Sequence, residues 1–166
     1  MEKTIKSAVF GGGCFWCLEP IFAKTKGVTS VVVGYAGGVK ENPTYEEVHS
    51  GETGHAEVVR VEFDPSIITY DELVKLFFAS HDATTLNRQM HEVGPYYRSI
   101  ILYSDADQQE VAEKIKENLS KLVRGGEVIT EIVSFEKFYV AEEDQQEYFE
   151  KNPEKSSCCA VSGSRT

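Results

Sequence analysis

The chain has 166 residues, 41% of them hydrophobic, and a formal net charge of −10 at pH 7. This length fits one domain with a substantial core. The negative charge disfavours nucleic acid and anionic membrane surfaces as partners. No apolar run is long enough to cross a bilayer, and the first residues lack the apolar stretch of a signal peptide, so we expect a cytoplasmic protein. Four cysteines favour redox chemistry or metal binding over a permanent disulfide framework.

The predicted elements begin with a strand at 5–10, a break at three glycines and a helix that ends before Gly27. Because proline lacks an N–H, Pro20 is tolerated best in a first turn, so regular helix starts either at Cys14 or nearer Cys17. Strands follow at 29–36 and 56–63. The long polar segment between them suggests a functional loop.

The second half of the chain continues in the same mixed pattern. The predicted elements are a helix at 69–80, an irregular stretch at 81–98, a strand at 99–103, a helix at 105–124, a strand at 128–135 and a short helix at 142–149. The order βαββαβ followed by αβα predicts an α+β fold, a two-layer sandwich with a ferredoxin-like (split βαβ) core and helices packed on the sheet. We expect one domain over residues 1–153 and a flexible tail over 154–166.

The most informative motif is GGGCFWCLEP at 11–20. A strand, a glycine turn and a helix would hold the Cys14 sulfur near a helix N-terminus, which favours the thiolate. The cysteine pair could also simply pack in a buried corner. A zinc site lacks a second well-spaced pair, so no metal is expected. Thioredoxin-like dithiols carry small or cyclic residues between their cysteines, whereas Phe15 and Trp16 stand here, which suggests that these aromatics serve a substrate.

Three further residues fit the same chemistry. Glu57 could be a solvated carboxylate, or an acid whose pKa is raised by burial so that it donates a proton. Tyr45 and Tyr97 could pack, or offer hydroxyl groups to a developing oxyanion. A thiolate, a proton donor and an apolar slot for a methyl group together suit a sulfoxide, whose sulfur becomes electrophilic when its oxygen is protonated.

The order of several motifs resembles that of a known family. They are GGGCFWCLEP, VVVGYAGG, NPTYEEVHSGETGHAEVVRVEFDP, NRQ…VG…YRS and FYVAEED…QEYFEKNP. Over residues 7–153 the chain is similar to the A-type peptide methionine-S-sulfoxide reductases. The resemblance implies reduction of methionine S-sulfoxide, peptide-bound or free, without a cofactor, and regeneration by thioredoxin or a similar dithiol. It also implies that residues 1–153 form the catalytic domain.

The resemblance assigns roles residue by residue. Cys14 matches the nucleophile that becomes a sulfenic acid, and Glu57 matches the proton donor. Tyr45 and Tyr97 match the tyrosines that bind the sulfoxide oxygen, and Phe15 and Trp16 match the aromatics that bind the methyl group. Glu92 stands at a substrate-binding position where the family usually has aspartate, and Gln145 stands where histidine is frequent.

Three cysteines are candidates for resolving the sulfenic acid. We favour a first disulfide between Cys14 and either Cys158 or Cys159, because a polar tail can swing over the site. Cys17 is then either buried and inert or a second-stage relay. Two other functions stay open from the residues alone, namely a non-catalytic module that binds oxidised peptides and a general thiol–disulfide oxidoreductase.

Overall fold

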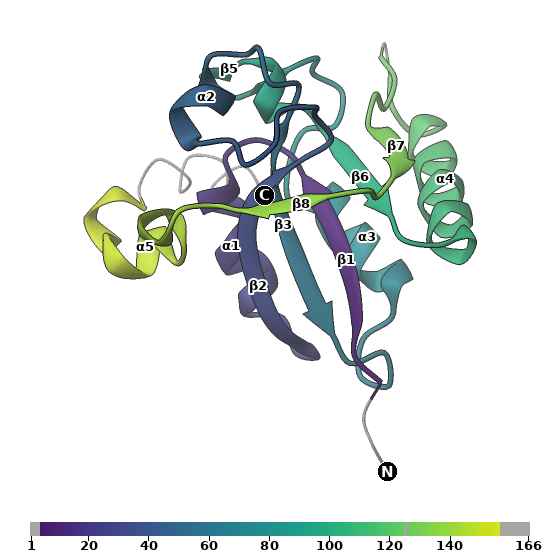
Figure 1. The fold of residues 1–166 in the computed structure, drawn as a ribbon. Helices are drawn as coiled ribbons and strands as arrows, with labels where there is room; N and C mark the ends of the chain where they lie inside the picture. The colour runs from purple at the N-terminus through teal and green to yellow at the C-terminus, as the bar shows by residue number, and fades with distance from the viewer. Residues whose placement is uncertain (1–3, 125, 157–166) are drawn as a thin grey trace.

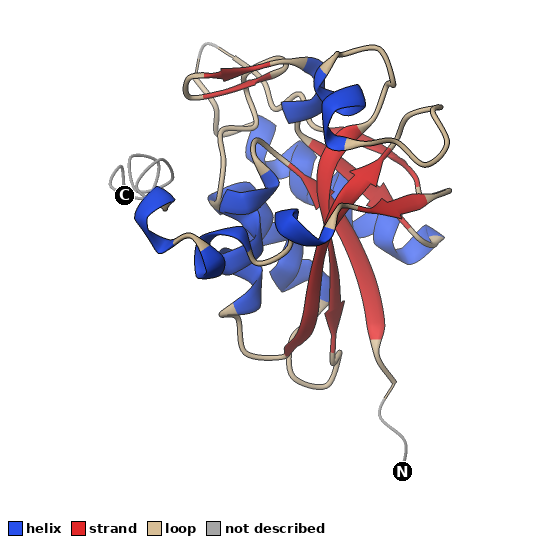
Figure 2. Ribbon diagram, turned by 60° about the vertical axis from the view of Figure 1, so that its left-hand side comes forward, coloured by secondary structure: helices blue, strands red, loops and turns tan. Residues whose placement is uncertain are grey.

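The computed structural model of the protein describes residues 4–124 and 126–156. Its main sheet has six strands in the order β7-β6-β1-β3-β2-β8, and a second sheet pairs β4 with β5 (Figures 1 and 2). The strands are β1 Lys6–Gly11, β2 Val28–Ala36, β3 Ala56–Phe63, β4 Arg88–Gln89, β5 Glu92–Val93, β6 Ile100–Tyr103, β7 Glu131–Ser134 and β8 Phe138–Val140.

The helices lie between and after these strands. They are α1 Phe15–Ala23, α2 Tyr45–His49, α3 Tyr70–Ala79, α4 Ala106–Ser120 and α5 Tyr148–Lys151, with 3-10 turns η1 Pro95–Tyr97, η2 Glu143–Gln145 and η3 Pro153–Lys155. The fold is therefore mixed α+β, which confirms the predicted class. Within 4–124 and 126–156, every helix falls short of the length and apolar content that crossing a membrane requires.

The strands of the main sheet pair antiparallel, except that β6 and β7 run parallel. Alternation along each strand divides the side chains between two faces. On one face, Phe10 and Val59 join a core cluster that includes residues of α1, α3 and α4. On the other face, Val9 and Val58 join a smaller cluster covered by aromatic residues of the segment around β8. Both faces of the central strands are therefore buried.

The first helix begins at a residue that agrees with only one of the two predicted starts. It begins at Phe15, directly after the N-cap residue Cys14, and Pro20 lies inside it. Pro20 cannot donate to the carbonyl of Trp16, so one intrahelical bond is lost. The helix continues because Leu18 and Phe22 remain in the core, with 1% and 0% of their surface exposed. A start near Cys17 is therefore wrong.

The segment between β2 and β3 is more regular than predicted. Thr44 and Glu47 form a capping box, in which each side chain bonds to the backbone N–H of the other residue. This cap begins the short helix α2. Other boundaries also moved: α4 ends at Ser120, β7 begins only at Glu131, and β8 was not predicted.

One end of the sheet gathers the loops that matter for function. Figure 1 shows α2 and β5 together at the end of the sheet where β1 leads into α1. The hydrogen bond from the Gly13 N–H to the Tyr97 carbonyl joins the glycine turn to η1 over 3.0 Å. Arg98 donates to the Gly54 carbonyl over 2.9 Å and so ties the same region to the segment before β3.

Candidate active site

Cys14 stands at the junction between β1 and α1. It is the N-cap residue of α1, with extended backbone angles, and only 7% of it is exposed. It is a thiol rather than half of a disulfide. Gly13, just before it, has a φ of 83°, and a Cβ built on Gly12 would come within 2.7 Å of the His81 ring. The glycines therefore permit both the turn and its close packing, as the sequence predicted.

Glu57 is a fully buried carboxyl group on the central strand β3, with 0% of the residue exposed. Its Oε1 accepts a hydrogen bond of 3.0 Å from the Phe15 N–H, next to Cys14 in the chain. Its Oε2 is in close contact with Nε2 of His49. Burial raises the pKa of Glu57, while the hydrogen bonds from His49 and Phe15 oppose that rise. The group is therefore disposed to hold a proton longer than an ordinary glutamate.

The two tyrosines of the predicted site face the same negative charges. Burial raises the pKa of Tyr45 and of Tyr97, and the charges of Glu57 and Cys14 raise both further. Both phenols therefore stay protonated at neutral pH. Burial and the charge of Glu57 also raise the pKa of Glu92. One buried oxygen of Glu92, Oε2, accepts no hydrogen bond from any residue of 4–124 or 126–156.

The aromatic residues form a layered wall. Phe15 is fully buried and lies 5.7 Å from the Tyr35 ring and 6.4 Å from the Tyr45 ring. Trp16 is half-buried, and the Tyr148 ring of α5 stacks on it at 3.6 Å. The Trp16 indole N–H donates to the side-chain oxygen of Gln145 over 2.9 Å. The glutamine at this position therefore fixes the orientation of the indole ring.

His49 is the residue that the sequence analysis missed. It ends α2, four residues after Tyr45, and its ring stacks on Tyr45 at 4.0 Å and on Tyr96 at 4.3 Å. Its Nε2 contacts the Glu57 carboxyl. The spacing of Thr44 and Glu47 was the available signal, because a capping box predicts a helix on which residues 45 and 49 share a face.

The remaining cysteines are only partly described. Cys17 is half-buried and takes part in a disulfide, so it is not a buried, inert thiol. Cys158 and Cys159, two of the predicted resolving residues, lie outside the described residues. Among the residues at 4–124 and 126–156, no group of three or more His, Cys, Asp or Glu side chains could hold a metal ion.

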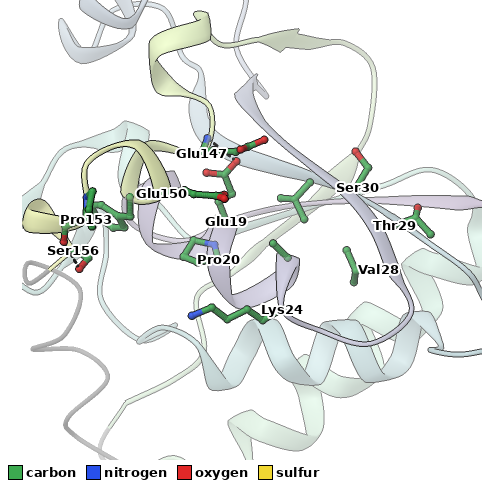
Figure 3. Close-up of a pocket in the computed structure, with 13 residues that line it drawn as sticks. Glu19, Pro20, Lys24, Val28, Thr29, Ser30, Glu147, Glu150, Pro153 and Ser156 are labelled. Carbon is green, nitrogen blue, oxygen red and sulfur yellow. Dashed lines mark hydrogen bonds between the residues drawn. The ribbon is translucent and has the colours of Figure 1, made fainter.

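A cavity of about 740 Å³ lies on another side of α1 (Figure 3). Glu19 and Pro20 of α1, strand β2 and the segment 147–156 line it. Glu19 accepts a hydrogen bond of 3.1 Å from the Glu147 N–H, and Ser156 also faces the cavity. None of the predicted site residues within 4–124 and 126–156 lines it. Cys14 and Glu57 are not among its lining residues.

Comparisons with known proteins bear on this arrangement. The family model described as peptide methionine sulfoxide reductase matches residues 6–166. The chain is 54% identical over 154 residues to the peptide methionine sulfoxide reductase MsrA of Nautilia profundicola, covering 93% of this chain and 88% of that one. It is 51% identical over 154 residues to the MsrA of Sulfolobus acidocaldarius, covering 93% and 87%.

Solved structures agree with these sequences. Methionine sulfoxide reductase A of Corynebacterium diphtheriae superposes with a TM-score of 0.80 and 36% identity, over 90% of this chain and 76% of that one. The reduced form of Mxr1 from Saccharomyces cerevisiae superposes with a TM-score of 0.84 and 34% identity, over 90% and 86%. The chain belongs to the peptide methionine sulfoxide reductase family.

Proposed function

We propose that this family member reduces methionine S-sulfoxide, in peptides or free, with Cys14 as the nucleophile and Glu57 as the proton donor. The observation that carries the assignment is the bond between Glu57 and the Phe15 N–H. It holds a buried acid beside the residue that follows the thiol. Tyr45 and Tyr97 bind the sulfoxide oxygen, and Phe15 and Trp16 accommodate the methyl group.

The proposed chemistry transfers one oxygen atom. The Cys14 thiolate attacks the sulfoxide sulfur while Glu57 protonates the oxygen. The sulfur–oxygen bond of the substrate and the newly formed sulfur–sulfur bond then break as the protonated oxygen passes to the Cys14 sulfur, so that methionine leaves and Cys14 becomes a sulfenic acid. The methionine sulfur gains two electrons and the cysteine sulfur loses two. A second thiol then attacks the sulfenic sulfur, water leaves, and a disulfide forms.

Glu92 is proposed to position the substrate. Its Oε2 is buried, and no residue of the described ranges donates a hydrogen bond to it. A buried acceptor in this state is costly unless a ligand supplies a donor. A peptide N–H of the oxidised substrate would supply one. The longer side chain of glutamate, compared with the aspartate usual in the family, would set how far that donor can lie from the sulfoxide.

Cys158 and Cys159 are proposed as resolving thiols, with Cys17 as a relay. Ser156 lines the same cavity as Glu19 and Pro20 of α1. Ser156 is the last residue that the structure describes before these two cysteines in the sequence. The disulfide at Cys17 supports a relay role. Residues 1–153 are proposed as the catalytic domain and 154–166 as the tail that carries these thiols.

The final electrons are proposed to come from thioredoxin or a similar dithiol. The yeast protein Mxr1 has been solved in complex with Trx2, and that structure superposes on this chain with a TM-score of 0.62 and 25% identity, over 89% of each chain. A reduced dithiol pool is a property of the cytosol, so we propose a cytoplasmic location.

The central strands are proposed to follow a split βαβ, ferredoxin-like arrangement. The neighbouring order β6-β1-β3-β2 supports this, because each adjacent pair is antiparallel and β3 lies between β2 and β1. In such an arrangement two parallel strands joined by a helix are separated by a third strand. Strands β7 and β8 then extend the core at both edges.

Mass spectrometry tests the activity. The protein is incubated with dithiothreitol and each epimer of a methionine sulfoxide peptide, and we expect the loss of one oxygen atom from the S epimer alone. Reduction of neither epimer would contradict the proposal. Peptide mapping after one equivalent of sulfoxide identifies the first disulfide. An earliest disulfide between Cys14 and Cys17, with Cys158 and Cys159 still reduced, would overturn the assignment of the resolving thiols.

A further inference from the structure

Glu57 raises a question of proton supply. Its side chain is only 1% exposed, yet an acid that protonates a substrate in every cycle must be reloaded. Oε1 is occupied by the Phe15 N–H, and a backbone amide donates a hydrogen bond without giving up its proton at neutral pH. The route for a proton must therefore reach Glu57 through another neighbour.

The neighbouring phenols are poor sources. The pKa values of Tyr45 and Tyr97 are raised by burial and by the charges of Glu57 and Cys14, so both hydroxyls hold their protons firmly. Glu92 cannot easily supply a proton either, because the burial and the charge of Glu57 that raise its pKa also make it compete for the same proton. These groups bind and orient oxygen but do not connect Glu57 to the solvent.

His49 has the geometry that this connection requires. Its Nε2 contacts Oε2 of Glu57, and 21% of its side chain is exposed. Its other ring nitrogen, Nδ1, makes no hydrogen bond with any residue of the described ranges. Tyr45 and Tyr96 stack on the ring and hold its plane, while Tyr97 meets it edge-on at 5.7 Å. One nitrogen therefore faces the buried acid from a ring that reaches the solvent.

We infer that His49 is a positioning and proton-relay residue that reloads Glu57 from the solvent during each reduction. This inference rests on the proposed function. Glu57 gives its proton to the sulfoxide oxygen, His49 passes a proton from Nε2 to Oε2, and Nδ1 takes one from water. An imidazole ring can accept a proton at one nitrogen while it donates one from the other. Because the Cys14 thiol releases one proton before it attacks, the reductive step consumes no net proton.

The test is the multiple-turnover rate of methionine formation with saturating dithiothreitol in His49→Gln, His49→Ala and the wild type, because Glu57 must be reloaded between turnovers. Glutamine retains an N–H donor for Glu57 but cannot relay a proton, so we expect a loss of roughly ten- to hundredfold. Imidazole in the buffer should restore part of the rate in His49→Ala and should do nothing in His49→Ala combined with Glu57→Gln. His91→Gln is the matched control, because His91 is exposed on the neighbouring loop, and it should keep the wild-type rate.

The pH dependence separates a relay from a support for the fold. His49 lowers the pKa of Glu57, so His49→Ala should move the falling limb of the rate to higher pH while lowering its maximum. The groups that face the ring are Glu57, Glu92, Tyr45, Tyr96 and Tyr97. A His49→Gln rate within twofold of the wild type, with an unchanged pH profile, would overturn the inference. A slow His49→Ala whose rate does not rise when imidazole is added would overturn it as well.

Because two variants are used, the test stays decisive if one of them misfolds. If His49→Ala fails to fold, the folded His49→Gln decides the question through its rate and pH profile. An inactive wild type would instead contradict the proposed function and leave no rate to compare. The two failures are therefore distinguishable.

Discussion

Two histidines flank the turn that carries Cys14, and they lie in opposite environments. His81 bonds through both ring nitrogens, at 2.8 Å to the Phe77 carbonyl and at 2.7 Å to the Ser99 hydroxyl, which continues to Thr130 at 2.7 Å. His49 bonds through one nitrogen to a buried acid, and the rest of its ring reaches the solvent. A hydrogen-bond network whose groups all bond within the protein fixes structure. A network that reaches the solvent at one end can move protons.

The comparison also explains where the chemistry lies. Ser99 and Thr130 are 4% and 0% exposed, and the His81 ring lies against Gly12. That side of the turn holds the backbone of Gly12 in place. The side of Glu57 presents groups of altered acidity to the thiol. Burying the carboxyl group of Glu57 costs free energy, and a buried acid of raised pKa is typical of functional sites.

On the side of the turn that faces Glu57, we expect the largest loss of activity from Cys14→Ser. A hydroxyl is not ionised near neutral pH and is a far weaker nucleophile, so we expect turnover to be lost with any reductant. Methionine formation from a sulfoxide peptide measures this. Cys17→Ser is the matched control and should keep single-turnover reduction. Activity of Cys14→Ser above about a tenth of the wild type would contradict the role of Cys14 as the nucleophile.

Glu57→Gln removes the acidic proton of the side chain but keeps the side chain's size and shape. The amide can still bond to the Phe15 N–H and to the sulfoxide oxygen, but it cannot protonate that oxygen. We expect kcat to fall about 10²–10⁴-fold, with an unchanged melting temperature or a slightly higher one, because the raised pKa marks a carboxyl that gains from losing its charge.

The result also discriminates between two acids. A loss of less than about threefold in Glu57→Gln would assign the proton transfer to another group, because general acid catalysis contributes far more than that. Glu92 is the first alternative, since its pKa is also raised by burial. The matched variant is Glu92→Gln, which we expect to raise KM more than it lowers kcat.

Trp16→Ala removes part of the apolar wall. We expect kcat/KM to fall by an amount that corresponds to about 1–3 kcal/mol, because a small buried apolar contact is lost. Gln145→Ala is a milder version, since the indole stays but loses its 2.9 Å hydrogen bond. Rates with methyl and larger alkyl sulfoxides test the pocket. Unchanged discrimination in a folded Trp16→Ala would show that the methyl group binds elsewhere.

The sequence predicted the elements whose periodicity is strong. Strand β3 has its predicted bounds at 56–63, and α3 lies between the predicted ends because Thr69 caps it and its apolar residues recur on one face. Strand β8 and the late start of β7 were missed because short edge strands are set by partners distant in the sequence, such as Tyr35 opposite Tyr139. Local propensity does not encode those partners.

Some features of the site were likewise predictable from neighbouring residues in the sequence, and others were not. Cys14 was predicted to lie at a helix N-terminus because strand, glycine turn and helix are neighbours in the sequence. The contact of His49 with Glu57 crosses from α2 to β3, and the bond of Trp16 to Gln145 joins residues 129 apart. Tertiary packing alone brings such groups together. The pKa shift of Glu57 was anticipated as a possibility, but its burial depends on the sheet register that places Glu57 opposite Tyr35.

The closed side of the turn is tested by stability rather than activity. Burial lowers the pKa of His81 from 6.5 to about 4, while the bond to the Phe77 carbonyl opposes this. The folded state therefore favours the neutral ring, so its contribution is fully present above pH 6.5 and is lost as the pH falls through about 4. For this half-buried residue the loss amounts to at most about 3.5 kcal/mol.

His81→Gln cannot titrate, so it should be less stable than the wild type at pH 7 and closer to it at pH 4.5. Urea unfolding at both values measures the difference, with His91→Gln as the exposed control. We expect kcat of folded His81→Gln to change less than that of Trp16→Ala, because the ring supports Gly12 and touches no reacting atom. A stability difference that stays constant with pH would contradict a neutral, closed network. A kcat loss as large as that of Glu57→Gln would place both histidines on the reactive side and remove the contrast between them.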